Sequence, residues 1–168
     1  MVSLKLRYLP CCVVLALAAA MAAGGMPVSA QTMKTPMVYK HIYPDAASAH
    51  TDLAGALRQA KAEHKRIILD FGGDWCGDCQ VLDIYMHQSP NQELLAKHFI
   101  VVHVNVGHFD QNTDIARTYG IPLNKGVPAL AVLDEHGKLL YAQKTGEFED
   151  MRNMSASSLT EFLNRWKA

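Results

Sequence analysis

The sequence predicts an α/β fold in which a central mixed β-sheet is flanked by helices on both faces. Three short apolar runs of the kind found in buried strands are separated by segments with a helical spacing of apolar residues. The third run leads into a tight turn and a further strand-like run, which predicts a closing antiparallel hairpin. Strands that alternate with helices and then end in a hairpin are typical of a mixed, covered sheet.

Residues 1–30 are predicted to be a secretory signal peptide. Lys5 and Arg7 provide the positive start, residues 9–23 form an apolar run, and Val28-Ser29-Ala30 has the small residues that signal peptidase requires. An uncleaved membrane anchor is the alternative, but the run is shorter than the ~20 residues that a span needs. We therefore expect cleavage near Ala30 and a protein that is periplasmic or secreted.

The charge balance argues against nucleic acid as a partner. The whole chain has 16 basic and 16 acidic residues, and cleavage removes two basic residues, which leaves 14 against 16. A net charge of about −2 provides no electrostatic footprint for nucleic acid or for an anionic membrane surface. The remaining 138 residues fit one domain with one core, and we expect a monomer.

The mature chain is expected to begin with a polar, proline-marked tether over residues 31–44, with a short strand at 37–42. The folded domain follows over residues 45–168. Asp45 or Ser48 can cap its first helix, which should run to about Lys65. The apolar face of this helix is formed by Leu53, Ala56, Leu57 and Ala60.

Residues 66–71 are an apolar run typical of a fully buried strand. A helix should begin near Cys76 and end at about His87, and Ser89-Pro90-Asn91 should start a short helix through Lys97. The next strand is expected over residues 99–106.

The last third of the domain contains the predicted hairpin. Thr113 can cap a helix that ends near Gly120. Gly126-Val127-Pro128 leads into a strand over residues 129–133, and a turn at 134–137 connects it to a returning strand. That strand is expected over residues 138–143, and a final helix runs from Ser155 or Ser157 to Trp166.

Cys76 and Cys79 are the two cysteines left after export, since Cys11 and Cys12 leave with the signal peptide. A structural disulfide is one interpretation. Closing a loop of about four residues contributes only roughly 2 kcal/mol, and a domain of this size does not need such a staple.

A zinc site is a second interpretation of the same pair, with His98 and His103 as further ligands. The gap between the cysteines and these histidines is longer than usual, and the histidines fall in a strand region. His98, His103 and His108 are evenly spaced by five residues, which matches neither one helix face nor one strand face. We expect no metal.

A redox dithiol is the interpretation that the spacing favours. A cysteine at a helix start faces unpaired backbone N–H groups and the positive end of the helix dipole, and both stabilise the thiolate that attacks disulfides. A second cysteine one turn inward can then attack the mixed disulfide intramolecularly. Cys76 is therefore the predicted nucleophile and Cys79 the predicted resolving cysteine.

Nearby residues support this chemistry. Asp70 lies in an apolar run, where a buried carboxylate would hold a proton more readily and could relay it to or from Cys79; a strand-end aspartate bonded to backbone is the alternative. A cis bond before Pro128 would turn the backbone edge of Val127 toward an extended peptide, whereas a trans bond would make it an ordinary strand-start proline. Trp75 offers a flat apolar platform, although tryptophan is also a common core residue.

The pattern D-F-x-x-x-W-C-x-x-C, followed by a strand, G-V-P, a hairpin and a final helix, resembles the thioredoxin superfamily over about residues 46–166. The stretch M-H-Q-S-P-N-Q-E-L-L is similar to small exported thioredoxin-like proteins and to the C-terminal domain of bacterial transmembrane disulfide reductases. The resemblance implies a thioredoxin-like fold without a cofactor, with Cys76 as nucleophile and Cys79 as resolving cysteine. It also implies Asp70 as buried acid and Pro128 as cis-proline.

Two positions depart from the family pattern. Gly77-Asp78 replaces the familiar Gly-Pro between the cysteines, and Gly72-Gly73 replaces a bulky-small pair, which would loosen the loop near the site. Asp78 should oppose the neighbouring thiolate, and the absence of a basic residue between the cysteines then predicts a reducing protein. The alternative is that Asp78 points into water and is screened.

These features predict a periplasmic thiol–disulfide oxidoreductase that reduces disulfides in extended or partly unfolded proteins. A membrane-embedded thiol reductase is the expected electron donor, as the family resemblance implies. The alternative is a non-catalytic binding module that keeps the fold and uses Cys76 and Cys79 only as a structural disulfide.

Overall fold

A four-stranded mixed sheet forms the centre of the domain in the computed structural model, which describes residues 39–168. The strand order is β2-β1-β3-β4; β1 is parallel to β2, and β3 is antiparallel to both β1 and β4. The strands are β1 (Arg66–Gly72), β2 (Phe99–Asn105), β3 (Ala129–Leu133) and β4 (Leu139–Ala142). The predicted mixed sheet and its closing hairpin are confirmed. The predicted signal peptide lies outside the described residues.

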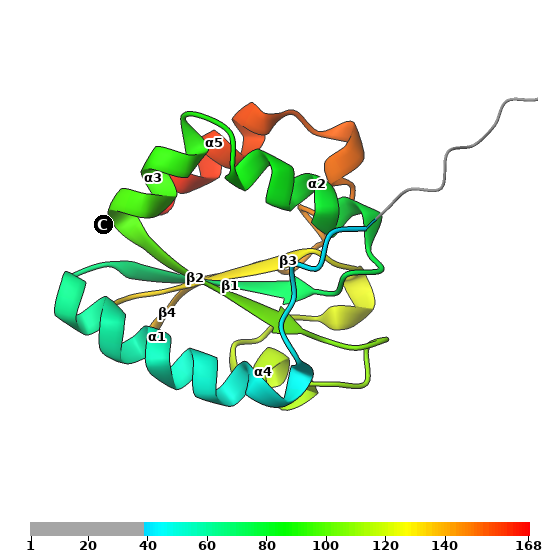
Figure 1. The fold of residues 1–168 in the computed structure, drawn as a ribbon, viewed down its shortest axis with the longest axis horizontal. Coiled ribbons are helices and arrows are strands. Elements are labelled where there is room, and N and C mark those ends of the chain that lie inside the picture. Colours follow the sequence, from blue (N-terminus) through cyan, green and yellow to red (C-terminus); the bar gives the residue numbers. More distant parts are fainter. Residues whose placement is uncertain (1–38) are drawn as a thin grey trace, which may run out of the picture. The chain divides into compact units, whose positions relative to one another are not determined.

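Helices cover both faces of the sheet, as predicted. Figure 1 shows α1 and α4 on one face and α2, α3 and α5 on the other. No helix in the range 39–168 combines the length and apolarity needed to cross a bilayer. The helices are α1 (Ala49–Glu63), α2 (Gly77–Met86), α3 (Asn91–His98), α4 (Thr113–Thr118) and α5 (Ala156–Trp166), and short 3-10 turns are η1 (Ala46–Ser48), η2 (Leu123–Lys125) and η3 (Met151–Asn153).

Strand β1 is buried along almost its whole length because both of its faces are covered. Ile67, Leu69 and Phe71 pack in the cluster that includes the buried face of α1, whereas Ile68 packs in the cluster that includes α2 and α5. Side chains alternate along a strand, so Asp70 shares the face of Ile68 and lies beneath α2. This register decides where the carboxylate sits.

The segment before η1 differs from the predicted tether. Residues 39–42 form no strand, and the backbone N–H groups of Ile42 and Tyr43 donate to Asp74 Oδ1 at 2.8 and 2.9 Å. Lys40 N–H donates to Gln80 Oε1 at 2.9 Å, and Tyr43 is fully buried. The described part of this segment is therefore fastened to the loop before α2 and to α2 itself, and the strand predicted at 37–42 is wrong over residues 39–42.

Helix α4 begins at Thr113, the residue predicted to be its N-cap, so the prediction is one residue too late. Asn112 occupies the N-cap position with a φ of 50°, and its Nδ2 donates to the carbonyls of Asn105 and Ala46 at 2.7 and 2.9 Å. Asparagine tolerates the left-handed region better than most residues. Asn112 therefore turns the chain after β2 and connects it to the start of η1.

Replacing Asn91 by alanine is expected to destabilise the domain by about 2–3 kcal/mol. Its fully buried amide donates to the carbonyls of Tyr85 and Ala156 at 3.0 and 3.2 Å and accepts from Thr160 Oγ1 at 2.6 Å, so alanine would remove three hydrogen bonds that connect α2, α3 and α5. Urea unfolding of Asn91→Ala measures the loss. The exposed neighbour Gln92→Ala is the matched control, and an equal effect of both variants would contradict this role.

Candidate active site

Cys76 and Cys79 form a disulfide at the start of α2. Cys76 is the N-cap residue of this helix, and its Sγ accepts a hydrogen bond from the Cys79 backbone N–H at 3.1 Å. Cys76 is 5% exposed and Cys79 is 1% exposed. The sulfur of Cys76 thus receives an N–H group of the first turn, and Cys79 lies behind it.

The loop before β3 contacts the disulfide directly. Cys76 Sγ lies 3.4 Å from the carbonyl oxygen of Val127, and the Val127–Pro128 peptide bond is cis. Ser89–Pro90 is also cis, away from the cysteines in sequence. Val127 and Pro128 therefore lie beside Cys76, where the sequence predicted a peptide-binding edge.

Trp75 presents an exposed aromatic surface next to the disulfide. It is 39% exposed, and its Nε1 donates to the carbonyl of Gly107 at 2.7 Å. His108 stacks on the ring at a centroid distance of 5.4 Å, and Phe109 packs against it edge-on at 5.5 Å. Trp75 is therefore not a core residue. The sequence places His108 and Phe109 in a loop after a strand, but nothing in their spacing indicates this contact.

Asp70 is buried beneath α2 and binds two side chains. The Tyr43 hydroxyl donates to Asp70 Oδ2 at 2.9 Å, and His103 Nδ1 lies 2.8 Å from the same oxygen. Among the described residues, Asp70 Oδ1 has no hydrogen-bond partner. The alternative of an aspartate bonded to backbone is wrong. The register pairs Asp70 with His103, whereas Tyr43 comes from the segment expected to be a tether.

Burial and the neighbouring carboxylate change the acid–base properties of both partners. Burial, and then the charge and hydrogen bond of Asp70, raise the pKa of Tyr43 well above its usual value, so the phenol keeps its proton. Burial alone would lower the pKa of His103, but the hydrogen bond to Asp70 and its charge outweigh burial and raise that pKa. The Asp70–His103 pair is thus strongest when the imidazole is protonated.

The stability that His103 contributes is expected to fall as the pH rises. Because its pKa is higher in the folded state, the contribution is fully present below the unfolded value of about 6.5 and is lost as the pH passes the folded value. Urea unfolding of wild type and His103→Gln should show a larger difference at about pH 5.5 than at about pH 9. His50→Gln, at an exposed pair with Asp114, is the control. A difference independent of pH would contradict the pairing.

Asp78 is paired with Arg152 and is not directed into water, so the alternative of a screened, solvent-facing carboxylate is wrong. It is 7% exposed, and Arg152 donates to it from the backbone N–H and Nε to Oδ1 at 3.0 and 3.1 Å and from Nη2 to Oδ2 at 2.9 Å. Gly77 lies beside the same guanidinium, since a Cβ there would be 3.8 Å from Arg152 Nη1. The negative charge between the cysteines is therefore offset by a residue distant in sequence.

Substitutions at the Asp78–Arg152 pair are expected to shift the reactivity of Cys76 in opposite directions. Arg152→Gln removes the guanidinium that offsets the Asp78 charge beside the thiols and disfavours the thiolate, whereas Asp78→Asn leaves a guanidinium that favours it. Iodoacetamide alkylation of the reduced protein at about pH 7 should slow in the first and accelerate in the second, by about two- to fivefold because Arg152 is largely exposed. Arg58→Gln is a remote control. Shifts in the same direction would contradict this account.

Gly72 and Gly73 make room for side chains of the site. A Cβ on Gly72 would overlap the Tyr43 hydroxyl and would lie 2.8 Å from Cys79 Sγ. A Cβ on Gly73 would lie 2.6 Å from Trp75 Nε1. The two glycines allow three side chains of the site to approach the backbone.

The zinc interpretation is not supported by this arrangement. Cys76 and Cys79 are bonded to each other, and His103 faces Asp70. Within residues 39–168, no three histidine, cysteine, aspartate or glutamate side chains are grouped to hold a metal ion.

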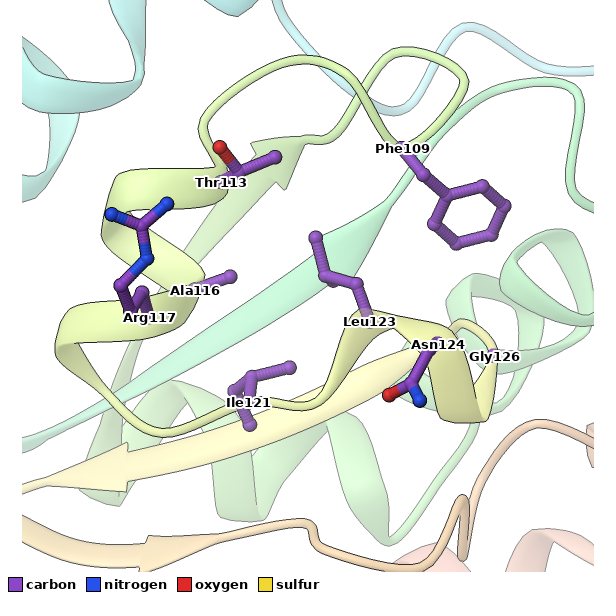
Figure 2. A pocket seen from close by; sticks show the side chains of 8 residues that line it. All are labelled: Phe109, Thr113, Ala116, Arg117, Ile121, Leu123, Asn124 and Gly126. Carbon is purple, nitrogen blue, oxygen red and sulfur yellow. The ribbon is translucent and has the colours of Figure 1, made fainter.

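A pocket of about 620 Å³ adjoins the exposed side of the site. Figure 2 shows side chains of α4 on one side of it and Phe109 on the other. Phe109 also contacts Trp75, and Gly126 precedes Val127, so the pocket continues from the surface around the disulfide. Its lining is formed by Phe109, Thr113, Ala116, Arg117, Ile121, Leu123, Asn124 and Gly126.

Known proteins resemble the chain in sequence and fold. A family model described as thioredoxin-like matches residues 48–135. A disulphide isomerase from Xylella fastidiosa Temecula1 is 38% identical, with 76% of this chain and 98% of that chain covered and a TM-score of 0.72. None of the curated proteins matches the chain.

Two more distant structures share the fold. The reduced C-terminal domain of DsbD from Neisseria meningitidis is 20% identical, with 75% of this chain and 100% of that chain covered and a TM-score of 0.51. A thioredoxin from Thermus thermophilus is 18% identical, with 76% of this chain and 87% of that chain covered and a TM-score of 0.51.

Proposed function

Because the chain belongs to the thioredoxin-like family, we propose that it is a thiol–disulfide oxidoreductase that reduces disulfides of protein substrates in the periplasm. The observation that carries this proposal is the position of the Cys76 sulfur, at the N-terminus of α2 and 3.4 Å from the Val127 carbonyl. A nucleophile at a helix start with a backbone edge beside it suits attack on a disulfide in an extended peptide.

The reaction uses the two cysteines in turn. In the reduced protein, the Cys76 thiolate attacks one sulfur of the substrate disulfide, and the other substrate sulfur leaves as a thiolate. Cys79 then loses its proton and attacks Cys76 Sγ, which releases the first substrate sulfur as a thiolate and forms the Cys76–Cys79 disulfide. The substrate gains two electrons and the protein loses two. Asp70 is the buried base that takes the proton of Cys79.

The surroundings of Cys76 favour protein substrates. Trp75 and Phe109 form an exposed aromatic surface on one side of the disulfide, and Val127 and Pro128 border it on another. An extended chain can place its backbone along Val127 and its apolar side chains over the aromatic rings. Folded substrates with buried disulfides would not reach Cys76, which is only slightly exposed.

Location and electron supply follow from the same proposal. A signal peptide over residues 1–30 would deliver the domain to an oxidising compartment. Each reduction leaves the Cys76–Cys79 disulfide, which must be reduced again before the next turnover. A membrane-embedded thiol reductase is the class of donor that can bring electrons into that compartment.

Disulfide isomerisation is a second candidate, because the 38% identical relative is described as a disulphide isomerase. It begins with the same attack by Cys76, after which another substrate cysteine, rather than Cys79, resolves the mixed disulfide. Both candidates require Cys76 as a reactive thiol. A non-catalytic binding module would instead keep partner binding when both cysteines are replaced.

Turnover of a protein disulfide tests the proposal. The protein should accelerate reduction of insulin by dithiothreitol, and Cys76→Ser should show no acceleration. Titration against glutathione then gives the reduction potential of the Cys76–Cys79 pair and hence the direction of electron flow. A protein that reduces disulfides should have a potential well below those of strong periplasmic oxidants. Absence of acceleration, or equal activity of Cys76→Ser, would contradict the proposal.

A further inference from the structure

Tyr43 lies between the buried carboxylate and the resolving cysteine. Its hydroxyl donates to Asp70 Oδ2 at 2.9 Å. The space above Gly72 is bounded by that hydroxyl and by Cys79 Sγ, since a Cβ there would overlap the first and lie 2.8 Å from the second. The phenol oxygen therefore contacts the carboxylate, and it borders the same space above Gly72 as Cys79 Sγ.

We propose that Tyr43 carries the proton that Cys79 loses when it resolves the mixed disulfide, passing it to Asp70. The inference rests on the proposed function and deepens it by adding a residue to the resolution step. The Cys79 S–H bond breaks as its proton moves to the Tyr43 oxygen, and the phenolic proton moves to Asp70 Oδ2. Cys79 is left as a thiolate, Asp70 becomes a carboxylic acid and Tyr43 is again a neutral phenol.

The properties of Tyr43 suit this transfer. A phenol hydroxyl donates one hydrogen bond and accepts others, and within residues 39–168 the oxygen of Tyr43 accepts none. Its raised pKa keeps the hydroxyl protonated, so Tyr43 passes a proton without ionising. The fully buried position excludes bulk water as the acceptor at this oxygen.

Within residues 39–168, no charged group other than Asp70 is hydrogen-bonded to the Tyr43 hydroxyl. His103, on β2, binds Asp70 Oδ2 at 2.8 Å. Asp74, in the loop before α2, accepts from the backbone of Tyr43, and Asp83, on α2, pairs with Lys40 at 2.9 Å. Asp70 is thus the carboxylate hydrogen-bonded to the Tyr43 hydroxyl.

Two-phase release of thionitrobenzoate tests the proposal in the full mature protein. The reduced protein is mixed with dithiobis(nitrobenzoate); the first release reports attack by Cys76 and the second reports resolution by Cys79. Tyr43→Phe should leave the first phase unchanged and slow the second at least about tenfold at pH 7. The second phase should also become more strongly dependent on pH, since Cys79 must then ionise without a relay.

Controls separate a proton relay from a packing effect. Tyr39→Phe makes the same chemical change at an exposed tyrosine and should alter neither phase. Asp70→Asn should resemble Tyr43→Phe, and the double variant should be no slower than the slower single variant, because both act on one route. In wild type, the rate of the second phase should be measured in mixtures of light and heavy water. Its dependence on the fraction of heavy water should correspond to the transfer of two protons.

Each result decides between the claims. The relay would be overturned if the second phase of Tyr43→Phe had the wild-type rate, or if the heavy-water dependence in wild type corresponded to the transfer of one proton. Either result would leave the proposed function intact. The measurement in wild type remains decisive if Tyr43→Phe does not fold. A wild-type protein that releases no thionitrobenzoate in the first phase would instead overturn the proposed function.

Discussion

Replacement of Cys79 by alanine is expected to turn the protein into a trap for its substrates. Cys76 keeps its place at the start of α2 and beside Val127, so it still forms a mixed disulfide. The intramolecular attack that releases the substrate is lost, and multiple turnover should fall by at least about a hundredfold. Non-reducing electrophoresis of an extract from the exporting cell should show new adducts that reductant removes, and mass spectrometry identifies the captured proteins.

Cys76→Ala is the matched control for the trap. It leaves the less exposed Cys79 as the single thiol near the surface of the site, and neither turnover nor adducts are expected. Equal adduct formation in both variants would contradict the assignment of nucleophile and resolving cysteine. A binding module would instead capture the same partners in wild type and in both variants, without bonds that reductant removes.

Gly72→Ala is expected to disrupt the site by adding one methyl group. The new carbon would overlap the Tyr43 hydroxyl and would lie 2.6 Å from Tyr43 Cζ and 2.8 Å from Cys79 Sγ. Strand β1 and the disulfide hold the backbone, so Tyr43 must move and its hydrogen bond to Asp70 must lengthen or break. Overpacking of this kind destabilises by about 1–3 kcal/mol, and the second phase of thionitrobenzoate release should slow.

Gly55→Ala is the matched control, because the same substitution is expected to stabilise the domain at this position. Gly55 lies within α1, where a Cβ would meet only the end of the Arg58 side chain at 3.9 Å. Alanine is the better helix former, so this variant should gain about 0.5–1 kcal/mol. Urea unfolding of the two variants compares them directly. A neutral or stabilising effect of Gly72→Ala would show that the space above Gly72 is not occupied as described.

Periodicity and turn chemistry in the sequence predict most of the fold. The apolar run from Arg66 needs both faces covered, and β1 is indeed buried between two layers of helices. The turn signals around Asp134 and Gly137 predict the hairpin of β3 and β4, and Asp134 accepts the backbone N–H groups that close it. These features depend on residues that are neighbours in sequence.

The candidate site is predicted only in part because some of its contacts depend on distant segments. The C-x-x-C spacing predicts a cysteine at a helix start, which needs no tertiary information. Tyr43 reaches Asp70 only because the segment before η1 is bound to Asp74, and Arg152 reaches Asp78 only because η3 packs on α2. Neither residue has a periodic or motif signal, so composition could suggest only a tether and an unpaired charge.

The two flanking contacts lie outside the stretch that matches the family model, residues 48–135. Tyr43 precedes that stretch and Arg152 follows it, so the shared module carries the dithiol while its ends supply the neighbours of Asp70 and Asp78. Substitutions at these two ends can therefore change the surroundings of Asp70 and Asp78 without altering the C-x-x-C motif itself.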